Sequence, residues 1–330
     1  MKRLLTICLL FVCWGYSAKA QVDPHFSQFF VSPTWVNPAF TGAFDGAYRV
    51  TAVYRSQWAD IAGGFKTMGV GAEVVTDKNV NVGANIFQQT TGTGYTYQNA
   101  SISFAYTGVK LDGYKQITFA LKGGFIGKRF DASKFQTEEQ WNYITGYNAA
   151  APSSEYMKTN NSMVFDAGAG ILYYDLDDSK KVIPFIGISF DHINGPAEGF
   201  LSTSKMEKLP MRITAHASFG ISMSDDVVVT PSLLYLSQGS ASEKMLGVMV
   251  LNKVSDDLNL IGGINYRLQD AWVPFVGMQY GNMKLGASYD VNRSDLGKTI
   301  SLSNSMEFSL SYIFQKTAKE DMRFLRCPQF

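Results

Sequence analysis

The sequence predicts an all-β protein, a transmembrane antiparallel β-barrel of about 14 strands. Apolar and polar residues alternate with a period of two from about Tyr48 to Phe314, as strands with two different faces require. Only 17% of the residues are charged and 14% are aromatic, whereas soluble domains have about 25% charged residues. The chain therefore has too few charges for an ordinary water-facing surface.

A soluble β-sandwich would show the same alternation, with its apolar face forming a core. In a barrel the apolar face contacts lipid and the polar face lines the lumen. Two observations favour the barrel: the alternating runs exceed the usual strand of about five or six residues, and aromatic residues lie near the strand ends. These aromatic residues are Tyr48, Tyr54, Trp58, Tyr95, Tyr97, Tyr106, Trp272, Tyr280, Tyr312 and Phe314.

Residues 1–20 are predicted to be a signal peptide. Lys2 and Arg3 precede an apolar run, and Ala18-Lys19-Ala20 has the small residues of a cleavage site. The mature chain then begins at Gln21, and no later apolar run reaches the roughly 20 residues that a spanning helix needs. Cleavage leaves Cys327 as the single cysteine, so we expect no disulfide framework.

Residues 21–46 are predicted to form a plug-like periplasmic segment. Its prolines exclude a regular strand or a long helix. Its aromatic residues should be buried, either in the barrel lumen or at the periplasmic mouth. The residues expected to fix this plug or to contact a partner are Pro24, His25, Phe26, Gln28, Phe29, Trp35, Asn37, Pro38, Phe40 and Gly42.

Residues 47–314 are predicted to form the barrel. The expected strands are 47–58, 66–76, 80–90, 95–107, 115–129, 162–175, 182–192, 209–222, 227–237, 244–254, 258–268, 272–280, 283–293 and 304–314. Connections after even-numbered strands are short, whereas several of the others, notably 131–161 and 193–208, are longer. Bacterial barrels have short periplasmic turns and longer extracellular loops. This pattern places both termini in the periplasm.

The sequence shows no chemistry typical of an enzyme. His25, His192 and His216 lack the spacing of metal ligands, and no nucleophile or phosphate-binding motif occurs. We therefore expect no catalytic residues, no metal and no cofactor. A net charge of +1 also argues against nucleic acid as a partner. Several cations should face the lumen, where they either select anions or pair with carboxylates: Arg49, Arg55, Lys122, Arg212 and Arg267.

Several stretches resemble the PorP/SprF family of type IX secretion system membrane proteins of the Bacteroidetes. The most specific is Asp-Pro-His-Phe-Ser-Gln-Phe-Phe at 23–30, followed by Asn-Pro-Ala-Phe-Thr-Gly at 37–42. The likeness continues at 54–58, 192–196, 266–274 and 286–292, and in the ending Arg-Cys-Pro-Gln-Phe at 326–330. The barrel stretches contain Arg55, Trp58, His192, Arg267, Asp270, Trp272 and Asp290.

The resemblance implies a non-enzymatic outer-membrane component of type IX secretion or gliding, which assists export or surface anchoring of cargo such as large adhesins. Implied partners are outer-membrane lipid, type IX components in the periplasm and outer membrane, and the secreted cargo. Residues 315–330 would be a periplasmic contact tail, with candidates Arg323, Phe324, Arg326, Cys327 and Phe330. The aromatic loop around Trp141, Tyr143, Tyr147 and Tyr156 is the candidate outer binding surface. The alternative is a diffusion channel for hydrophobic or small solutes, similar to fatty-acid channels.

Overall fold

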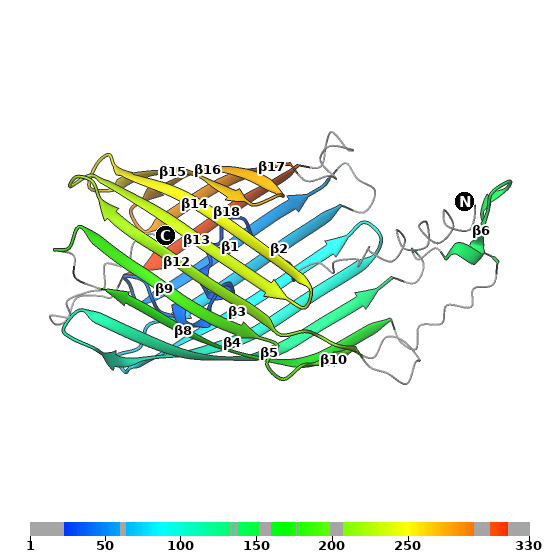
Figure 1. Ribbon diagram of the computed structural model, residues 1–330, viewed down its shortest axis with the longest axis horizontal. Coiled ribbons are helices and arrows are strands. Elements are labelled where there is room, and N and C mark those ends of the chain that lie inside the picture. Colours follow the sequence, from blue (N-terminus) through cyan, green and yellow to red (C-terminus); the bar gives the residue numbers. More distant parts are fainter. Residues whose placement is uncertain are drawn as a thin grey trace, which may run out of the picture.

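The computed structural model describes residues 23–59, 64–131, 134, 137–148, 150–151, 160–175, 177, 179–198, 207–293 and 304–315. Fourteen strands form one closed antiparallel barrel (Figure 1). They are β1 (Tyr48–Gln57), β2 (Phe65–Val74), β3 (Val80–Thr91), β4 (Tyr95–Lys110), β5 (Lys115–Phe130), β8 (Asn161–Asp175), β9 (Val182–Asp191), β12 (Arg212–Ser222), β13 (Val227–Gln238), β14 (Ala241–Lys253), β15 (Leu258–Arg267), β16 (Ala271–Tyr280), β17 (Met283–Asn292) and β18 (Ser305–Phe314). Each predicted strand overlaps one of these, so the predicted fold class is confirmed.

Barrel closure joins the two ends of the strand series. β1 pairs with β18 from Tyr48 opposite Phe314 to Gln57 opposite Ser305. Because every strand has two partners, the barrel has no open sheet edge at this seam. The single closed sheet excludes the two stacked sheets of a soluble sandwich.

The strands divide their side chains between an apolar outer face and a more polar inner face. Leu121 and Val276 are each 67% exposed on the outside, and Thr51, Arg55 and Glu307 are buried inside. An apolar exterior is the surface that lipid acyl chains contact. Tyr95 and Tyr97 are exceptions to the predicted outer aromatic belt, because both lie at inward positions of β4. Tyr97 is 4% exposed, and Tyr95 packs against the inner cluster that contains Phe26 and Phe87.

The two ends of the barrel differ. At the turn end, where β1 begins and β18 ends, the connections 75–79, 111–114, 223–226, 254–257 and 281–282 are short. At the opposite loop end lie the long connections 131–160, 192–211 and 293–304. Barrels of this kind place such turns in the periplasm and such loops outside the cell.

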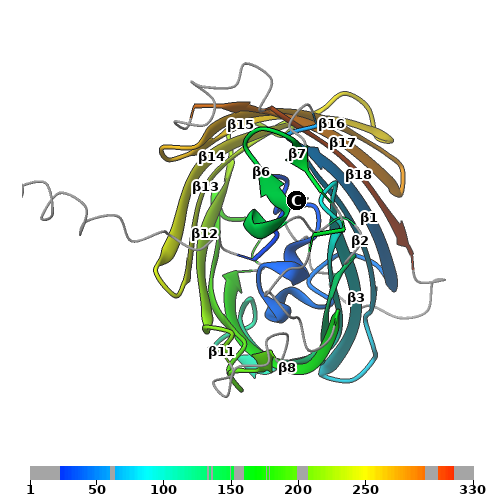
Figure 2. The ribbon, with the colours of Figure 1, turned by 90° about the vertical axis from the view of Figure 1, so that its right-hand side faces the viewer.

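Residues 23–47, called the N-terminal segment below, lie inside the barrel. Figure 2, a view onto the loop end, shows this segment in blue within the ring of strands. It contains two short 3₁₀ helices, η1 (Pro33–Trp35) and η2 (Pro38–Phe40). At the turn end its last residue, Ala47, donates its N–H to the carbonyl of Phe314.

Of the two places expected for the N-terminal segment, the lumen is the one observed, and the segment starts at the loop end of the barrel. Asp23 is hydrogen-bonded to Gln238, the last residue of β13, and to His192, which directly follows β9. Both of these residues belong to the loop end. The segment therefore runs through the lumen from the loop end to the turn end, and Asp23 lies at the opposite end of the barrel from Ala47.

Three small elements complete the described chain. The 3₁₀ helix η4 (Glu138–Gln140) and the hairpin of β6 (Trp141–Asn142) and β7 (Gly146–Tyr147) belong to the first long loop. The hairpin of β10 (Ala197–Glu198) and β11 (Glu207–Lys208) belongs to the second. Among the described residues, no helix is long and apolar enough to cross a membrane. The predicted signal peptide lies outside the described residues, as does the predicted tail apart from Gln315.

Candidate functional site

The lumen and the N-terminal segment form the candidate site. The polar residues at the start of the segment contact three different parts of the barrel wall: Asp23 meets His192, His25 meets Glu243 of β14, and Ser27 meets Asp290 of β17. Each contact involves a charged partner, and charge-assisted hydrogen bonds are roughly twice as strong as neutral ones. The pattern Asp-Pro-His-Phe-Ser-Gln therefore corresponds to a series of fixed attachment points across the loop end.

The first attachment point is an ionic cluster around His192. The Nε2 atom of His192 lies 2.5 Å from Asp23, and Nδ1 lies 2.7 Å from Asp166 on β8. Burial alone would lower the pKa of His192, but the hydrogen bonds and charges of Asp166 and Asp23 outweigh it and raise the pKa to about 9. Burial alone would raise the pKa of Asp23, but His192 and Arg212 outweigh it and lower that pKa. His192 is therefore a cation at neutral pH.

The attachment point at Ser27 is a cluster of arginines and carboxylates near the β1–β18 seam. The N–H groups of Ser27 and Gln28 each donate to Glu307 at 2.8 Å. The Ser27 hydroxyl donates to Asp290, which also accepts from Arg55 at 2.9 Å and Arg267 at 2.8 Å. All of these side chains are buried. A single carboxylate thus ties three strands to the segment.

Aromatic packing joins two parts of the N-terminal segment to each other and to the barrel wall. Phe26 stacks on Trp35 at 4.7 Å between ring centroids and contacts Phe87 of β3 at 5.5 Å. The Trp35 ring lies directly over Gly69 of β2, where an added Cβ would come within 1.9 Å of it. Because glycine has no side chain, the indole ring of Trp35 can pack directly against the backbone of β2.

The Asn-Pro-Ala-Phe-Thr-Gly stretch attaches the part of the segment that lies nearer the turn end. The side chain of Asn37 accepts from the Ala39 N–H at 2.9 Å, which caps η2, and donates to the Ile171 carbonyl at 3.0 Å. Gly42 has a φ of +77°, a conformation that favours glycine, and its N–H donates to Glu73 at 2.9 Å. Glu73 also pairs with Arg49. Both ends of η2 are therefore fixed by barrel groups.

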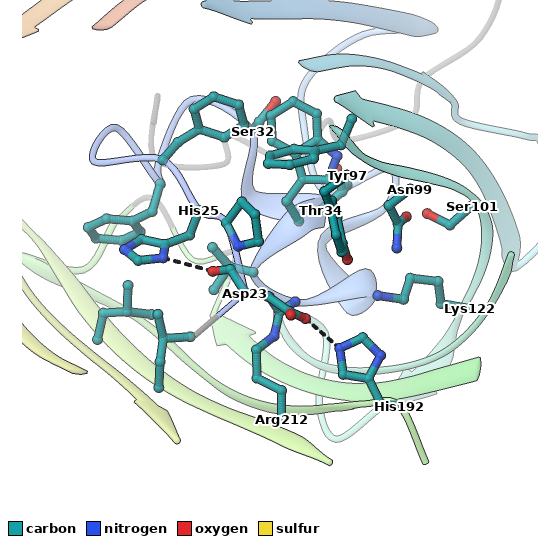
Figure 3. A pocket seen from close by; sticks show the side chains of 18 of the residues that line it. Asp23, His25, Ser32, Thr34, Tyr97, Asn99, Ser101, Lys122, His192 and Arg212 are labelled. Carbon is teal, nitrogen blue, oxygen red and sulfur yellow. Dashed lines mark hydrogen bonds and ion pairs between the residues drawn. The ribbon is translucent and has the colours of Figure 1, made fainter. Parts of the chain in front are cut away.

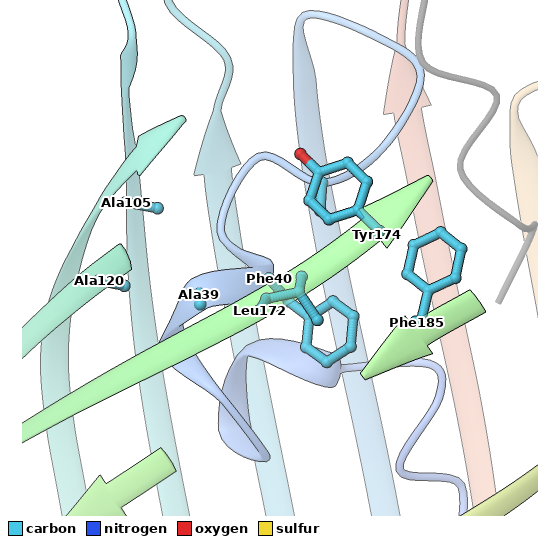
Figure 4. Packing of buried hydrophobic residues seen from close by; sticks show 8 residues of the cluster. Ala39, Phe40, Ala105, Ala120, Leu172, Tyr174 and Phe185 are labelled. Carbon is cyan, nitrogen blue, oxygen red and sulfur yellow. The ribbon is translucent and has the colours of Figure 1, made fainter. Parts of the chain in front are cut away.

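Two apolar clusters pack the segment against the barrel wall between these polar contacts. One joins the η2 region to β4, β5, β8 and β9 through Phe40, Leu172, Tyr174 and Phe185 (Figure 4). The other packs Phe30 and Val31 against inward residues of β14, β15 and β16, such as Phe275. Close-packed apolar side chains of this kind leave little room for water.

A small cavity lies between the first half of the segment and the barrel wall (Figure 3). Its volume is about 70 Å³, enough for a few water molecules by the usual limit of about 10–15 Å³ for one. Its wall contains both apolar and polar side chains. The lining includes Phe26, Phe29, Trp35, Phe87 and Leu234, and also Ser101, Lys122, His192 and Arg212.

The cations predicted to face the lumen do so, and each is paired. Arg49 contacts Glu73, Arg55 and Arg267 contact Asp290, and Lys122 and Arg212 both contact Asp191 of β9. Of the two alternatives drawn from the sequence, paired charges in a filled lumen fit these contacts, and a row of free anion-selecting cations does not.

The structure brings most of the predicted site residues together. The candidates from Pro24 to Gly42 lie in the lumen, with Phe26, Gln28, Asn37 and Phe40 buried. Arg55, Arg267, Asp270 and Asp290 form one connected cluster. Trp58 and Trp272 lie apart from it: Trp58 packs on Phe65 and Trp272 stacks on Tyr266. The candidates from Arg323 to Phe330 lie outside the described residues.

Several residues of the site were not identified from the sequence, and most of them are acidic. They are Asp23, Ser27, Glu73, Asp166, Asp191 and Glu307. The signal that could have found the acidic residues of the barrel wall is a carboxylate at an inward position of an alternating strand. Such a group needs a buried partner.

A hairpin in the first long loop exposes apolar residues. The side chain of Asn142 accepts from the Ile144 N–H at 2.8 Å and closes the tip between β6 and β7. At this tip Tyr143 is 97% exposed and Ile144 75% exposed, while Trp141 packs against Tyr147 at 5.9 Å. Figure 1 shows β6 beyond the end of the barrel. Tyr156 lies outside the described residues.

Comparisons with known proteins agree on a family and a fold. The family model for type IX secretion system membrane protein PorP/SprF matches residues 18–312. The toluene transporter TbuX of Ralstonia pickettii has a similar structure, with a TM-score of 0.52, 11% identity, and coverage of 86% of this chain and 94% of that one. The toluene transporter TodX of Pseudomonas putida is also similar in structure. Its TM-score is 0.50 and its sequence identity 10%, and the match covers 88% of this chain and 94% of that one. No curated protein matches the sequence.

Proposed function

The chain belongs to the PorP/SprF family of type IX secretion system membrane proteins, and from this premise we propose that it assists export or surface anchoring of a secreted cargo without conducting it. Its location is the outer membrane, and its role belongs to the secretion machinery. The cargo we propose is a large secreted protein such as an adhesin. Family and fold both point to a non-enzymatic component.

The observation that carries this proposal is that the N-terminal segment occupies the lumen and is attached to its wall. The N-terminal segment is attached by ionic contacts at the loop end, through Asp23 and Ser27, and by Gly42 toward the turn end. Two apolar clusters occupy the space between. A polypeptide passing through this barrel would have to displace all of these buried contacts. An anchoring or assisting role requires no such displacement.

The β6–β7 hairpin is the surface we propose for the cargo. Exposed aromatic residues dominate protein interfaces because they bury a large area. Trp141, Tyr143 and Ile144 present such an area at the loop end. On the opposite side, the predicted tail with Arg323, Phe324, Arg326, Cys327 and Phe330 is proposed to contact periplasmic type IX components.

The test is deletion of the encoding gene, followed by comparison of the surface and secreted proteomes. We expect loss of one large surface protein, or of the whole set of type IX cargo, with recovery on re-expression of the wild type. Re-expression of a Trp141→Ala, Tyr143→Ala double variant should restore the barrel but not cargo retention. An unchanged proteome in the deletion strain would contradict the proposal.

A second candidate function is a diffusion channel for hydrophobic or small solutes. The observation that favours it is the aromatic cavity beneath Phe26, together with the likeness in fold to two transporters described as toluene transporters. Planar-bilayer conductance and solute uptake into vesicles separate the two roles. A closed barrel supports anchoring, and a pore or solute flux would support transport.

A further inference from the structure

His192 has a carboxylate on each ring nitrogen. Asp166 lies against Nδ1 at 2.7 Å and Asp23 against Nε2 at 2.5 Å. A neutral imidazole carries one N–H, so one of its nitrogens would face a carboxylate with its lone pair. Protonated imidazole donates to both. The contact between the N-terminal segment and β8 through His192 therefore requires a proton.

The surrounding charges lead to the same conclusion. Arg212 of β12 lies 3.8 Å from Asp23 and also pairs with Asp191 of β9, which accepts from Lys122 of β5. Tyr97 of β4 and Gln238 of β13 face Asp23 as well. The cations Lys122, Arg212 and protonated His192 balance the carboxylates of Asp23, Asp166 and Asp191. Loss of the His192 proton leaves this buried cluster with an excess negative charge.

The same residues border the cavity. Asp23, Pro24, His25 and Phe26 all line it, and His192 and Arg212 belong to its wall (Figure 3). The start of the segment thus forms part of the cavity wall at the loop end, and its first attachment is the histidine contact. The lower attachments at Ser27 and Asn37 use other partners.

We propose that Asp23, His192 and Asp166 form a proton-dependent latch that fastens the outer end of the N-terminal segment over the cavity. Deprotonation of His192 releases the Asp23 carboxylate from this contact, and the contacts from His25 onward keep the rest of the segment in the lumen. The latch goes beyond the proposed function and does not depend on which cargo or solute the barrel serves.

The test uses a cysteine reporter in the cavity wall. Ser101 is buried, lines the cavity and is close in size to cysteine, so Ser101→Cys is placed in a Cys327→Ser background of the full mature chain in lipid vesicles. The rate of modification by a water-soluble thiol reagent is measured from pH 6.5 to 10.5. Dividing the rate in an added Asp23→Asn variant by the rate without it cancels the intrinsic pH dependence of the thiol.

At pH 7 we expect this ratio to be on the order of ten or more, because asparagine lacks the negative charge that pairs with protonated His192, and this pairing contributes roughly that factor. The ratio should fall toward one as pH rises through about 9. Asp112→Asn, in an exposed turn at the opposite end of the barrel, is the matched control and should give a ratio near one throughout. A ratio near one at pH 7, or a high ratio that does not change with pH, would overturn the latch.

A second measurement follows the proton directly. The chain contains three histidines, so ¹⁵N-histidine labelling gives a simple spectrum, and His192→Gln identifies the His192 signals. We expect both of its ring nitrogens to be protonated at pH 7 and to titrate together with the reporter ratio. A neutral His192 at pH 7 in the folded barrel would refute the proposal even if the reporter variants failed to fold.

Discussion

Replacing Asp290 by asparagine should weaken the attachment of the N-terminal segment more than any comparable change at the barrel rim. One oxygen of Asp290 accepts from the Ser27 hydroxyl, Arg55 and Arg267, and the side chain is 3% exposed. Asparagine keeps the shape of the side chain but removes the negative charge between the two guanidinium groups. Both cations then remain buried with one carboxylate fewer.

The expected loss of stability depends on the carboxylate partners that Arg55 and Arg267 retain in the variant. Removing one partner of a buried ion pair costs about 3–5 kcal/mol. Here Arg55 still has Glu307 at 3.5 Å, and Arg267 still has Asp270. We therefore expect the lower limit, about 3 kcal/mol, which corresponds to roughly a hundredfold larger population of the detached segment.

The assay is equilibrium urea unfolding in lipid vesicles, followed by tryptophan fluorescence and by the mobility of folded and unfolded protein in gels. Asp270→Asn is the matched control because Asp270 contacts the same Arg267 but is 41% exposed. Exposed pairs contribute about 0–1 kcal/mol, so this variant should be nearly as stable as the wild type. Equal losses for Asp290→Asn and Asp270→Asn would refute the assignment of Asp290 as the central buried counter-ion.

Three further outcomes are expected. The pKa of His192 rises from 6.5 to about 9 on folding, so its contribution to stability is full below pH 6.5 and is lost as pH rises through about 9; His192→Gln should remove this part of the pH dependence in urea titrations. Gly69→Ala should force Trp35 from its place and cost about 1–3 kcal/mol, whereas Gly113→Ala, whose added Cβ meets nothing within 4 Å, should not change the urea midpoint. Val276→Arg on the outer face should cost about 2–4 kcal/mol in vesicles, against about 0–1 kcal/mol for Gln98→Arg near the loop end; similar losses would contradict lipid contact at Val276.

The strands could be predicted because lipid and lumen impose opposite demands on successive residues. In β17, Leu285, Tyr289 and Val291 face outward while Ser288 and Asp290 face inward, and this alternation is visible in the sequence. The same rule placed Arg55 and Arg267 in the lumen. Tyr97 was misplaced because an aromatic residue near a strand end fits both an outer belt and an inner cluster. Tyr97 occupies an inward position of β4 and therefore belongs to the inner cluster with Phe26 and Phe87.

The course of the N-terminal segment could not be predicted in the same way. Its residues have no period, and their partners are far away in the chain: Asp23 meets His192, and Ser27 meets Asp290 and Glu307. The polar residue types indicated that the segment needs partners, and the prolines excluded a strand. Neither the polar residue types nor the prolines indicate at which end of the barrel those partners lie.

The partners of Ser27 could not be predicted because strands from both ends of the barrel sequence form this attachment point. Arg55 belongs to β1, and Asp290 and Glu307 belong to β17 and β18, so the pairing of β1 with β18 brings them together. Ser27 and Gln28 therefore find their complete set of partners only in the closed barrel. The segment must already be in the lumen, or must enter it, when the first and last strands meet. Attachment of Ser27 thus depends on barrel closure, and in return it stabilises the β1–β18 seam.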